Sequence, residues 1–384
     1  MRETVLFVSN GAGEDAIAAQ VAARLQGLKP LALPLVGQGA GYRGAAEVVG
    51  PRRDLPSGGL LPGAPGKLVR DLAAGLLGLT LRQLFFLRRL RRSCRVFVAV
   101  GDLYPVLLAG LAGCRPLLFV GTAKSVWHHG YSWPERWALR AFCRLCLVRD
   151  EPTARDLVSK GVAAEWVGNA MMDGLEPTGA DLGVGPDEPC LALFPGSRSQ
   201  AYQALPRMLE GYRHLVAGGT PARALVAVAP SLDLERLAAS CPGWRLVPRP
   251  GVERGAVAAL EGPAPPVMLV AGAFPDILHR SLVALGQAGT ANEQAAGLGL
   301  PVVAFEPGGP GRLGWYRGRQ KGLLGEALEV VPDDPRAVAA ALARLLADPA
   351  ERARRGQIGR ARLGPAGGAG RMAALIEAWA RASG

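Results

Sequence analysis

The chain has 384 residues, of which 49% are hydrophobic and 20% charged, and its formal net charge is +12. This length exceeds one ordinary core and favours two domains, while the hydrophobic content excludes a disordered chain. The charge favours anionic partners, although only five of the 44 basic residues are lysines, a bias that genome composition also produces.

Short β-like runs alternate with helical patterns along the chain, starting with a strand at 4–8 where a secretory leader would lie. In the first half the expected strands are 4–9, 31–36, 96–101, 116–121 and 145–148. In the second half they are 190–194, 224–229, 245–247, 267–271, 282–285 and 301–305. This alternation predicts an α/β protein with two Rossmann-like, doubly wound parallel-sheet domains facing across a cleft, where ligands bind at the carboxyl ends of strands.

Composition changes mark the expected domain boundaries. Residues 173–189 contain four glycines and three prolines without an apolar period, which is typical of a linker. We therefore expect an acceptor-binding domain at 1–172 and a nucleotide-sugar-binding domain at 190–363. A Gly-rich joint precedes a short amphipathic docking helix, so 364–384 is treated as a separate segment.

The first strand is followed by the sequence Asn-Gly-Ala-Gly-Glu-Asp at positions 10–15. It is not the dinucleotide fingerprint, because the third glycine of that motif would fall at Ala16. Glu14 and Asp15 instead place carboxylates at a helix start. They are either helix-capping residues or a general base and acceptor-sugar anchor. Asp102, after the strand at 96–101, is a second candidate base, or else a turn-forming residue.

The segment 67–95 carries Leu68, Leu72, Leu76 and Leu79 at helical spacing, and its arginines gather towards the end. It is either an interfacial helix that binds anionic lipid or a core helix with a solvated basic end. His128 and His129 lie among aromatic residues, which are either a substrate-binding cluster or surface packing. Of the six cysteines, only Cys143 and Cys146 have the spacing of a metal-ligand pair. No second cysteine pair and no histidine cluster lies nearby, so we expect no metal and interpret them as reduced core cysteines.

Two turns of the second half are candidate phosphate-binding elements. In the turn after the strand at 190–194, Gly196, Ser197 and Arg198 can grip phosphate oxygens, the alternative being a structural salt bridge for Arg198. The turn at 287–290 has only one long side chain and precedes a helix at 291–298, so its N–H groups can approach an anion. The alternative for its glycine is close packing of strand and helix.

Several motifs together resemble lipid-A-disaccharide synthase and its uncharacterised relatives. They lie at 11–15, 97–102, 119–127, 166–171, 191–198 and 285–305. The resemblance implies a GT-B fold and a peripheral membrane enzyme that transfers an acylated glucosamine from UDP to a second lipid, with inversion and without a metal.

The resemblance also implies residue roles. It places Arg198, Gly289 and Thr290 at the diphosphate and Asp102 at the position of an essential aspartate, if one residue is gapped. Asp15 matches the aspartate that closes the first-strand loop. The carboxylate that meets the ribose in related transferases is replaced by Gln294, with Glu293 next to it.

The sequence therefore predicts an inverting glycosyltransferase with a UDP-sugar donor and no cofactor. Its expected partners are a nucleotide sugar, a lipid-linked acceptor and the anionic inner face of the cytoplasmic membrane, with no nucleic acid. Its expected location is cytoplasmic and peripheral. A UDP-N-acetylglucosamine 2-epimerase-like enzyme and a non-catalytic sugar-nucleotide binder are the alternatives.

Overall fold

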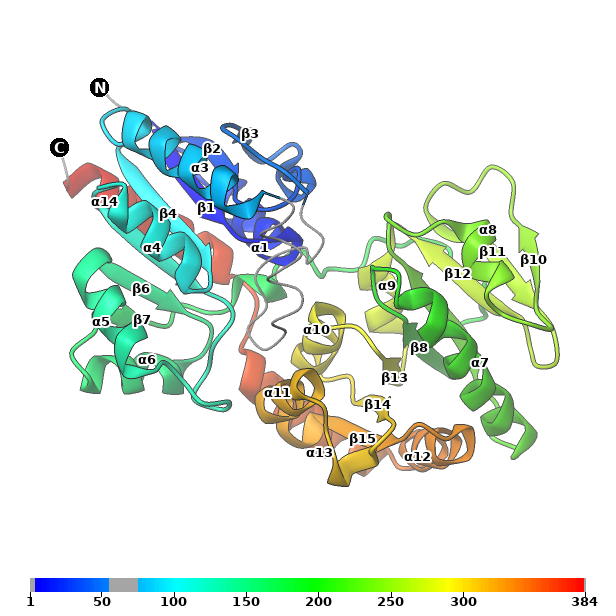
Figure 1. Ribbon diagram of the computed structural model, residues 1–384. Helices are drawn as coiled ribbons and strands as arrows, with labels where there is room; N and C mark the ends of the chain where they lie inside the picture. The colour runs from blue at the N-terminus through cyan, green and yellow to red at the C-terminus, as the bar shows by residue number, and fades with distance from the viewer. Residues whose placement is uncertain (1–3, 55–74, 383–384) are drawn as a thin grey trace. The chain divides into compact units, whose positions relative to one another are not determined.

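The computed structural model describes residues 4–54 and 75–382 (Figure 1). The chain divides into two compact units, residues 1–173 with 365–384 and residues 174–364. The predicted α/β class is confirmed, because each unit contains a largely parallel sheet flanked by helices. The described helices include none that is both long and apolar enough to cross a bilayer.

The first unit is built on a seven-stranded sheet in which every neighbouring pair is parallel. Its strand order is β3-β2-β1-β4-β5-β6-β7. The central strands are buried on both faces, so they are continuous apolar runs rather than alternating ones. The strands are β1 (Thr4–Ser9), β2 (Lys29–Pro34), β3 (Glu47–Val48), β4 (Val96–Gly101), β5 (Leu117–Gly121), β6 (Leu145–Val148) and β7 (Ala164–Glu165).

Helices cover both faces of this sheet. Helix α4 contacts both α3 and α5, while α1 contacts α14 (Figure 1). The helices are α1 (Ala12–Ala22), α3 (Leu76–Leu90), α4 (Leu103–Leu111), α5 (Trp133–Phe142), α6 (Glu151–Ser159) and α14 (Gly368–Ala382). Short 3-10 turns, η1 (Ala40–Tyr42) and η2 (Ala170–Met172), complete the unit.

The segment after residue 364 returns to the first unit. The Asp173 carboxylate accepts hydrogen bonds from the backbone N–H groups of Gly367 and Ala369, the latter at 2.7 Å, and so fastens the start of α14. Residues 174–189, expected to be a linker, are tied to the second unit, where the Asp276 carboxylate accepts from the N–H groups of residues 178–180.

The second unit has an eight-stranded sheet of order β10-β11-β12-β9-β8-β13-β14-β15. The expectation of parallel pairing is wrong at one edge, where β10, β11 and β12 are antiparallel, and β11 was not predicted. Parallel pairing needs a crossover of a dozen or more residues, and the connections between these strands are shorter. The strands are β8 (Cys190–Phe194), β9 (Arg223–Val228), β10 (Arg245–Pro248), β11 (Gly255–Glu261), β12 (Val267–Ala271), β13 (Val283–Gly286), β14 (Val302–Glu306) and β15 (Leu328–Pro332).

The helices of the second unit are α7 (Ala201–Ala217), α8 (Leu234–Ala239), α9 (Phe274–Arg280), α10 (Thr290–Leu298), α11 (Trp315–Leu324), α12 (Pro335–Ala347) and α13 (Pro349–Leu363), with 3-10 turns η3 (Gly309–Gly311) and η4 (Gly325–Ala327).

The close packing of α10, the helix that follows β13, depends on glycines. Gly356 and Gly359 of α13 face the carbonyl oxygens of Gly299 and Ala296, which a methyl group would overlap. Only glycine therefore allows α13 to approach α10 this closely.

Candidate functional site

The two predicted phosphate turns lie next to each other in the second unit. Strands β8 and β13 pair in parallel with Phe194 opposite Gly286, and the Gln287 N–H donates to the Phe194 carbonyl at 2.9 Å. The turns that leave these strands therefore share the carboxyl edge of the sheet. Of the predicted residues, Gly196, Ser197 and Arg198 follow β8, and Gly289, Thr290, Glu293 and Gln294 follow β13.

The β8 turn presents an arginine to solvent. Ser231 Oγ donates to the Ser197 carbonyl at 2.7 Å and holds the turn, while the Arg198 side chain is exposed. Across 4–54 and 75–382, no ion pair involves Arg198, so the structural salt bridge considered from the sequence is not formed. Its guanidinium is available to an anion.

The β13 turn leads into α10 with an open helix end. Gly289 is the N-cap and supplies no side-chain cap, so the first N–H groups of α10 face outward at the positive end of the helix. Thr290 is exposed, Gln294 is half-buried and Glu293 is buried. Arg198 and this helix end together form a cationic, donor-rich edge that suits a diphosphate.

A tyrosine that sequence reasoning missed lies at the same edge. The Tyr316 hydroxyl, from α11, packs against Gly289 so closely that a methyl group there would overlap it. Burial raises the pKa of Tyr316, the nearby Glu293 carboxylate raises it further, and Arg198 opposes the shift. The contact with Gly289 places the phenol at the β13 turn.

Buried polar side chains behind the loop were also missed. Asn292, Arg317 and Gln320 are almost fully buried and hydrogen-bond to one another and to the loop backbone. Arg317 and Gln320 lie in an ordinary polar helix pattern, so the sequence contains no signal that separates them from solvated residues. Asn292 is the one usable signal, since the helix positions three and four residues after it are the alanines 295 and 296, which mark a buried face.

In the first unit, Asp102 lies at the carboxyl edge of the sheet, directly after β4. Its Oδ1 accepts from the Tyr104 N–H at 2.9 Å and caps α4, while the Asn10 amide donates to its Oδ2 at 3.4 Å. Burial raises the pKa of Asp102, a change in the direction that a general base requires. The capping and the base hypotheses are therefore compatible, because the two carboxylate oxygens have different partners.

The other two predicted carboxylates lie in different environments. Glu14 is half-buried and packs over Gly101, where an added methyl group would overlap its side chain. Asp15 is only 2% exposed. Ser9 Oγ donates to Asp15 Oδ1 at 2.6 Å and lies 2.6 Å from the Tyr42 hydroxyl, so Tyr42 donates to Ser9. Burial raises the pKa of Asp15 to about 7.

The predicted amphipathic segment is only partly visible, since its residues 67–74, including Leu68 and Leu72, lie outside the described residues. Leu76 and Leu79 are buried on the core side of α3. A second stripe, Leu77, Leu81 and Phe85, is exposed, with Leu77 at 64% and Phe85 at 61%. The described part of the apolar period therefore belongs to the core, and the exposed stripe is a separate set of residues on α3.

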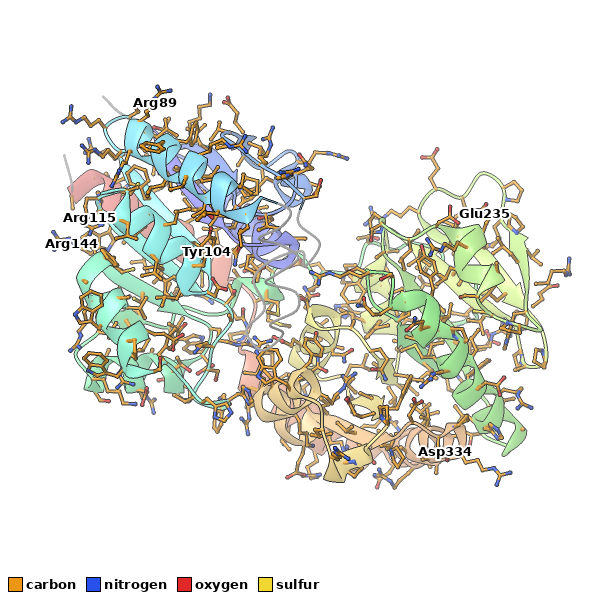
Figure 2. The ribbon with its side chains drawn as sticks, viewed as in Figure 1. Arg89, Tyr104, Arg115, Arg144, Glu235 and Asp334 are labelled. Carbon is orange, nitrogen blue, oxygen red and sulfur yellow. The ribbon has the colours of Figure 1, made fainter. Side chains whose placement is uncertain are left out.

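Basic and aromatic residues of the first unit lie at different edges of its sheet. Figure 2 shows Arg89, Arg115 and Arg144 in the first unit, away from Tyr104. Each of these arginines precedes a strand, whereas Tyr104 follows one, so the arginines lie at the amino edge of the sheet. The rings of His128 and His129 lie with their centroids 4.3 Å apart and their planes inclined at 59°. In the part of the chain that the structure describes, no cluster of His, Cys, Asp or Glu is arranged to hold a metal ion.

No family model matches the chain. A lipid-A-disaccharide synthase from Myxococcus xanthus (strain DK1622) is 29% identical over 150 residues, which make up 37% of this chain. The match spans about a third of that protein, 34% of its length. Over this stretch the resemblance to lipid-A-disaccharide synthase is confirmed.

Two solved structures match nearly the whole chain. CalG4, the calicheamicin glycosyltransferase, has a TM-score of 0.60 at 18% identity and covers 99% of this chain and 98% of its own. A UDP-GlcNAc 2-epimerase from Neisseria meningitidis bound to UDP-GlcNAc has a TM-score of 0.55 at 13% identity, with coverages of 98% and 99%. The chain therefore has the GT-B fold that the resemblance implied.

Proposed function

We propose that the protein is an inverting, metal-independent glycosyltransferase that moves a sugar from UDP to a lipid-linked acceptor. The observation that carries the proposal is the edge formed by the turns that follow the paired strands β8 and β13. Arg198 in the first turn forms no ion pair with any residue that the structure describes, and the N-terminus of α10 after the second has no side-chain cap. The similarity in fold to an epimerase bound to UDP-GlcNAc and to the calicheamicin glycosyltransferase supports a nucleotide-sugar donor.

The proposed chemistry is one displacement. Asp102 takes the proton of an acceptor hydroxyl, whose oxygen attacks the anomeric carbon of the donor sugar from the face opposite the diphosphate. The bond between that carbon and the β-phosphate oxygen breaks, and UDP departs with the electron pair. Arg198 and the N–H groups of Gly289 and Thr290 stabilise the added charge on the β-phosphate, so no metal is required.

The donor half of the proposal is tested by titrating the protein with UDP. In Arg198→Ala, the affinity for UDP should fall by about 10- to 100-fold, which corresponds to one charge-assisted hydrogen-bonding group. Arg245→Ala is the matched control, because Arg245 is an exposed arginine of the same unit that pairs with Glu261 at 2.5 Å. Equal affinity in the wild type and both variants would rule out the phosphate role of Arg198.

The acceptor half rests on the exposed surface of the first unit. The α3 stripe of Leu77, Leu81 and Phe85 precedes Arg88 and Arg89, a combination that suits an acyl boundary with anionic headgroups. Helix α5 adds exposed tryptophans at 133 and 137, one turn apart, and α4 joins the two helices in one layer. This apolar and basic face supports peripheral binding to the inner face of the membrane and a lipid-linked acceptor.

Vesicle flotation tests this membrane surface. With vesicles containing phosphatidylglycerol, the wild type should float and the double variant Leu81→Glu with Phe85→Glu should lose most of its bound fraction, because each carboxylate opposes both apolar insertion and the anionic surface. Val158→Glu, an exposed apolar position on α6, is the control and should float like the wild type. Equal flotation of all three proteins would contradict the assignment.

A UDP-N-acetylglucosamine 2-epimerase is the second candidate, favoured by the match to a UDP-GlcNAc-bound epimerase over 98% of this chain. That activity needs no lipid. Incubation of UDP-GlcNAc with the protein alone discriminates between the two. The transferase predicts that UDP is released only when a membrane extract supplies the acceptor, whereas an epimerase converts the sugar at C2 without it. A protein that binds UDP but does neither is a non-catalytic binder.

A further inference from the structure

The backbone of the β13 turn is held from behind by one side-chain amide. Gln320 Nε2 donates to the carbonyl oxygens of Ala288 and Gly289, at 3.1 and 3.2 Å. In a trans peptide the N–H points opposite to the carbonyl. Because both carbonyls are directed at Gln320, the N–H groups of Gly289 and Thr290 are directed away from it, towards the open end of α10.

The orientation of this amide is fixed by its other end. Gln320 Oε1 accepts from Arg317 Nη1 at 2.5 Å and from Asn292 Nδ2 at 3.2 Å, which uses both of its lone pairs. If the amide were flipped, its NH₂ group would face the N–H donor of Arg317, and its oxygen would face the two carbonyl oxygens of the loop. With 3% of its surface exposed, Gln320 therefore has a single rotamer and a single amide orientation that satisfy its neighbours.

Arg317 anchors the network to the sheet. It is 4% exposed, and burial lowers its pKa, while Glu306 at 3.5 Å opposes the shift. Its second amino group donates to Gln287 Oε1, and Gln287 Nε2 donates to the Phe305 carbonyl at 3.0 Å. A buried guanidinium is costly unless it is paired, so the Glu306 ion pair and the hydrogen bonds to Gln287 and Gln320 favour this one position of Arg317. The turn is thereby fixed to α11 and to the end of β14.

We propose that Gln320, oriented by Arg317, is a positioning residue that aims the N–H groups of Gly289 and Thr290 at the diphosphate. This inference rests on the proposed function, because it needs a diphosphate at that edge. Gln320 does not touch the ligand. Its effect is that the two donors are aligned before the ligand arrives, so binding does not have to order the turn.

The test is Gln320→Glu, titrated with UDP and with uridine. The carboxylate keeps the shape of the amide and accepts from Arg317, but it donates nothing to the two carbonyls and repels them. Affinity for UDP should fall at least about tenfold, which is the loss expected when one charge-assisted hydrogen bond is misaligned. Uridine has no phosphate, so its affinity should change less than about twofold.

Gln83→Glu is the matched control. Gln83 is also a buried glutamine whose amide donates to two backbone carbonyls, of Leu35 at 2.8 Å and Pro51 at 3.2 Å, but it lies in the first unit. The Gln83→Glu variant should have a lower melting temperature, as Gln320→Glu does, but an unchanged affinity for UDP. If Gln320→Glu does not fold, Gln320→Met, which removes the donors without adding a charge, takes its place with the same expectation.

The outcomes separate the two proposals. If the wild type prefers UDP to uridine and the Gln320 variant keeps that preference, the positioning role is overturned and the donor site stands. If both ligands weaken equally in the variant, Gln320 only supports the fold, and the positioning role is again overturned. If the wild type binds UDP no better than uridine, the proposed donor site fails and the positioning role fails with it.

Discussion

The turn after β1 and the turn after β13 have the same local design and opposite chemistry. Each is a strand-to-helix junction with a glycine N-cap, Gly11 or Gly289, that supplies no side-chain cap. Each places an acidic residue four positions after that glycine, Asp15 or Glu293. In both, the acidic side chain is buried.

The difference lies in what surrounds the two helix ends. At the first, Glu14 and Asp15 place two carboxylates in one turn, with the buried Ser9 hydroxyl as the donor to Asp15. At the second, Arg198 approaches from the neighbouring turn. We therefore expect an anion to be attracted to the second helix end and not to the first. A glycine turn at a helix start therefore indicates a phosphate site only when neighbouring elements supply positive charge and donors.

The largest expected effect comes from removing the candidate base in the first unit. Asp102→Asn keeps the cap on α4, because asparagine caps as well as aspartate, but it cannot take a proton. The rate of UDP release in the presence of acceptor should fall about 10²- to 10⁴-fold, while UDP affinity stays unchanged. Steady-state kinetics with membrane extract, combined with UDP titration, separates the two quantities.

Asp334→Asn provides the control for that experiment. Asp334 is also a helix N-cap, accepting from the Ala337 N–H at 2.8 Å in the second unit, and its amide variant should retain wild-type turnover. If Asp102→Asn turns over as fast as Asp334→Asn, Asp102 is a capping residue only, and the first edge contributes no base.

A smaller effect is expected from the buried Asp15, and it appears in stability. The folded pKa of about 7 exceeds the unfolded value of 3.8. The proton is therefore held more tightly in the folded state. The stability that the protonated Asp15 contributes is complete below about pH 4 and is lost as the pH rises to 7. Between pH 5 and 8 the wild type should lose about 2 to 3 kcal/mol of unfolding free energy through this group.

Asp15→Asn removes that titration while retaining an acceptor for Ser9. Urea denaturation of both proteins at pH 5 and pH 8 gives their unfolding free energies. The difference between the two pH dependences is the contribution of Asp15, because the other titrating groups are common to both proteins. The variant should be relatively more stable at pH 8. Parallel pH dependence of the two proteins would mean that Asp15 is not held in its neutral form, and would contradict the raised pKa that burial gives it.

Most elements of the fold could be predicted from the sequence. Buried parallel strands such as β4, β8 and β14 are continuous apolar runs, and the junctions that follow β1, β8 and β13 are marked by small residues. The antiparallel edge formed by β10, β11 and β12 could not be predicted in the same way, because β11 has no distinct period and strand direction depends on connection geometry.

The sequence by itself determined where the chain alternates between strand and helix and which turns have room for a ligand, because both depend on residues close together in the chain. Only the tertiary structure decided the chemistry of those turns. Arg198 and Gly289 come together through the pairing of β8 with β13, and Gln320 reaches the loop from the following helix. Asp15 owes its high pKa to burial beside Tyr42. The charge and the burial of a site depend on residues that are far apart in the sequence, so local sequence patterns do not predict them.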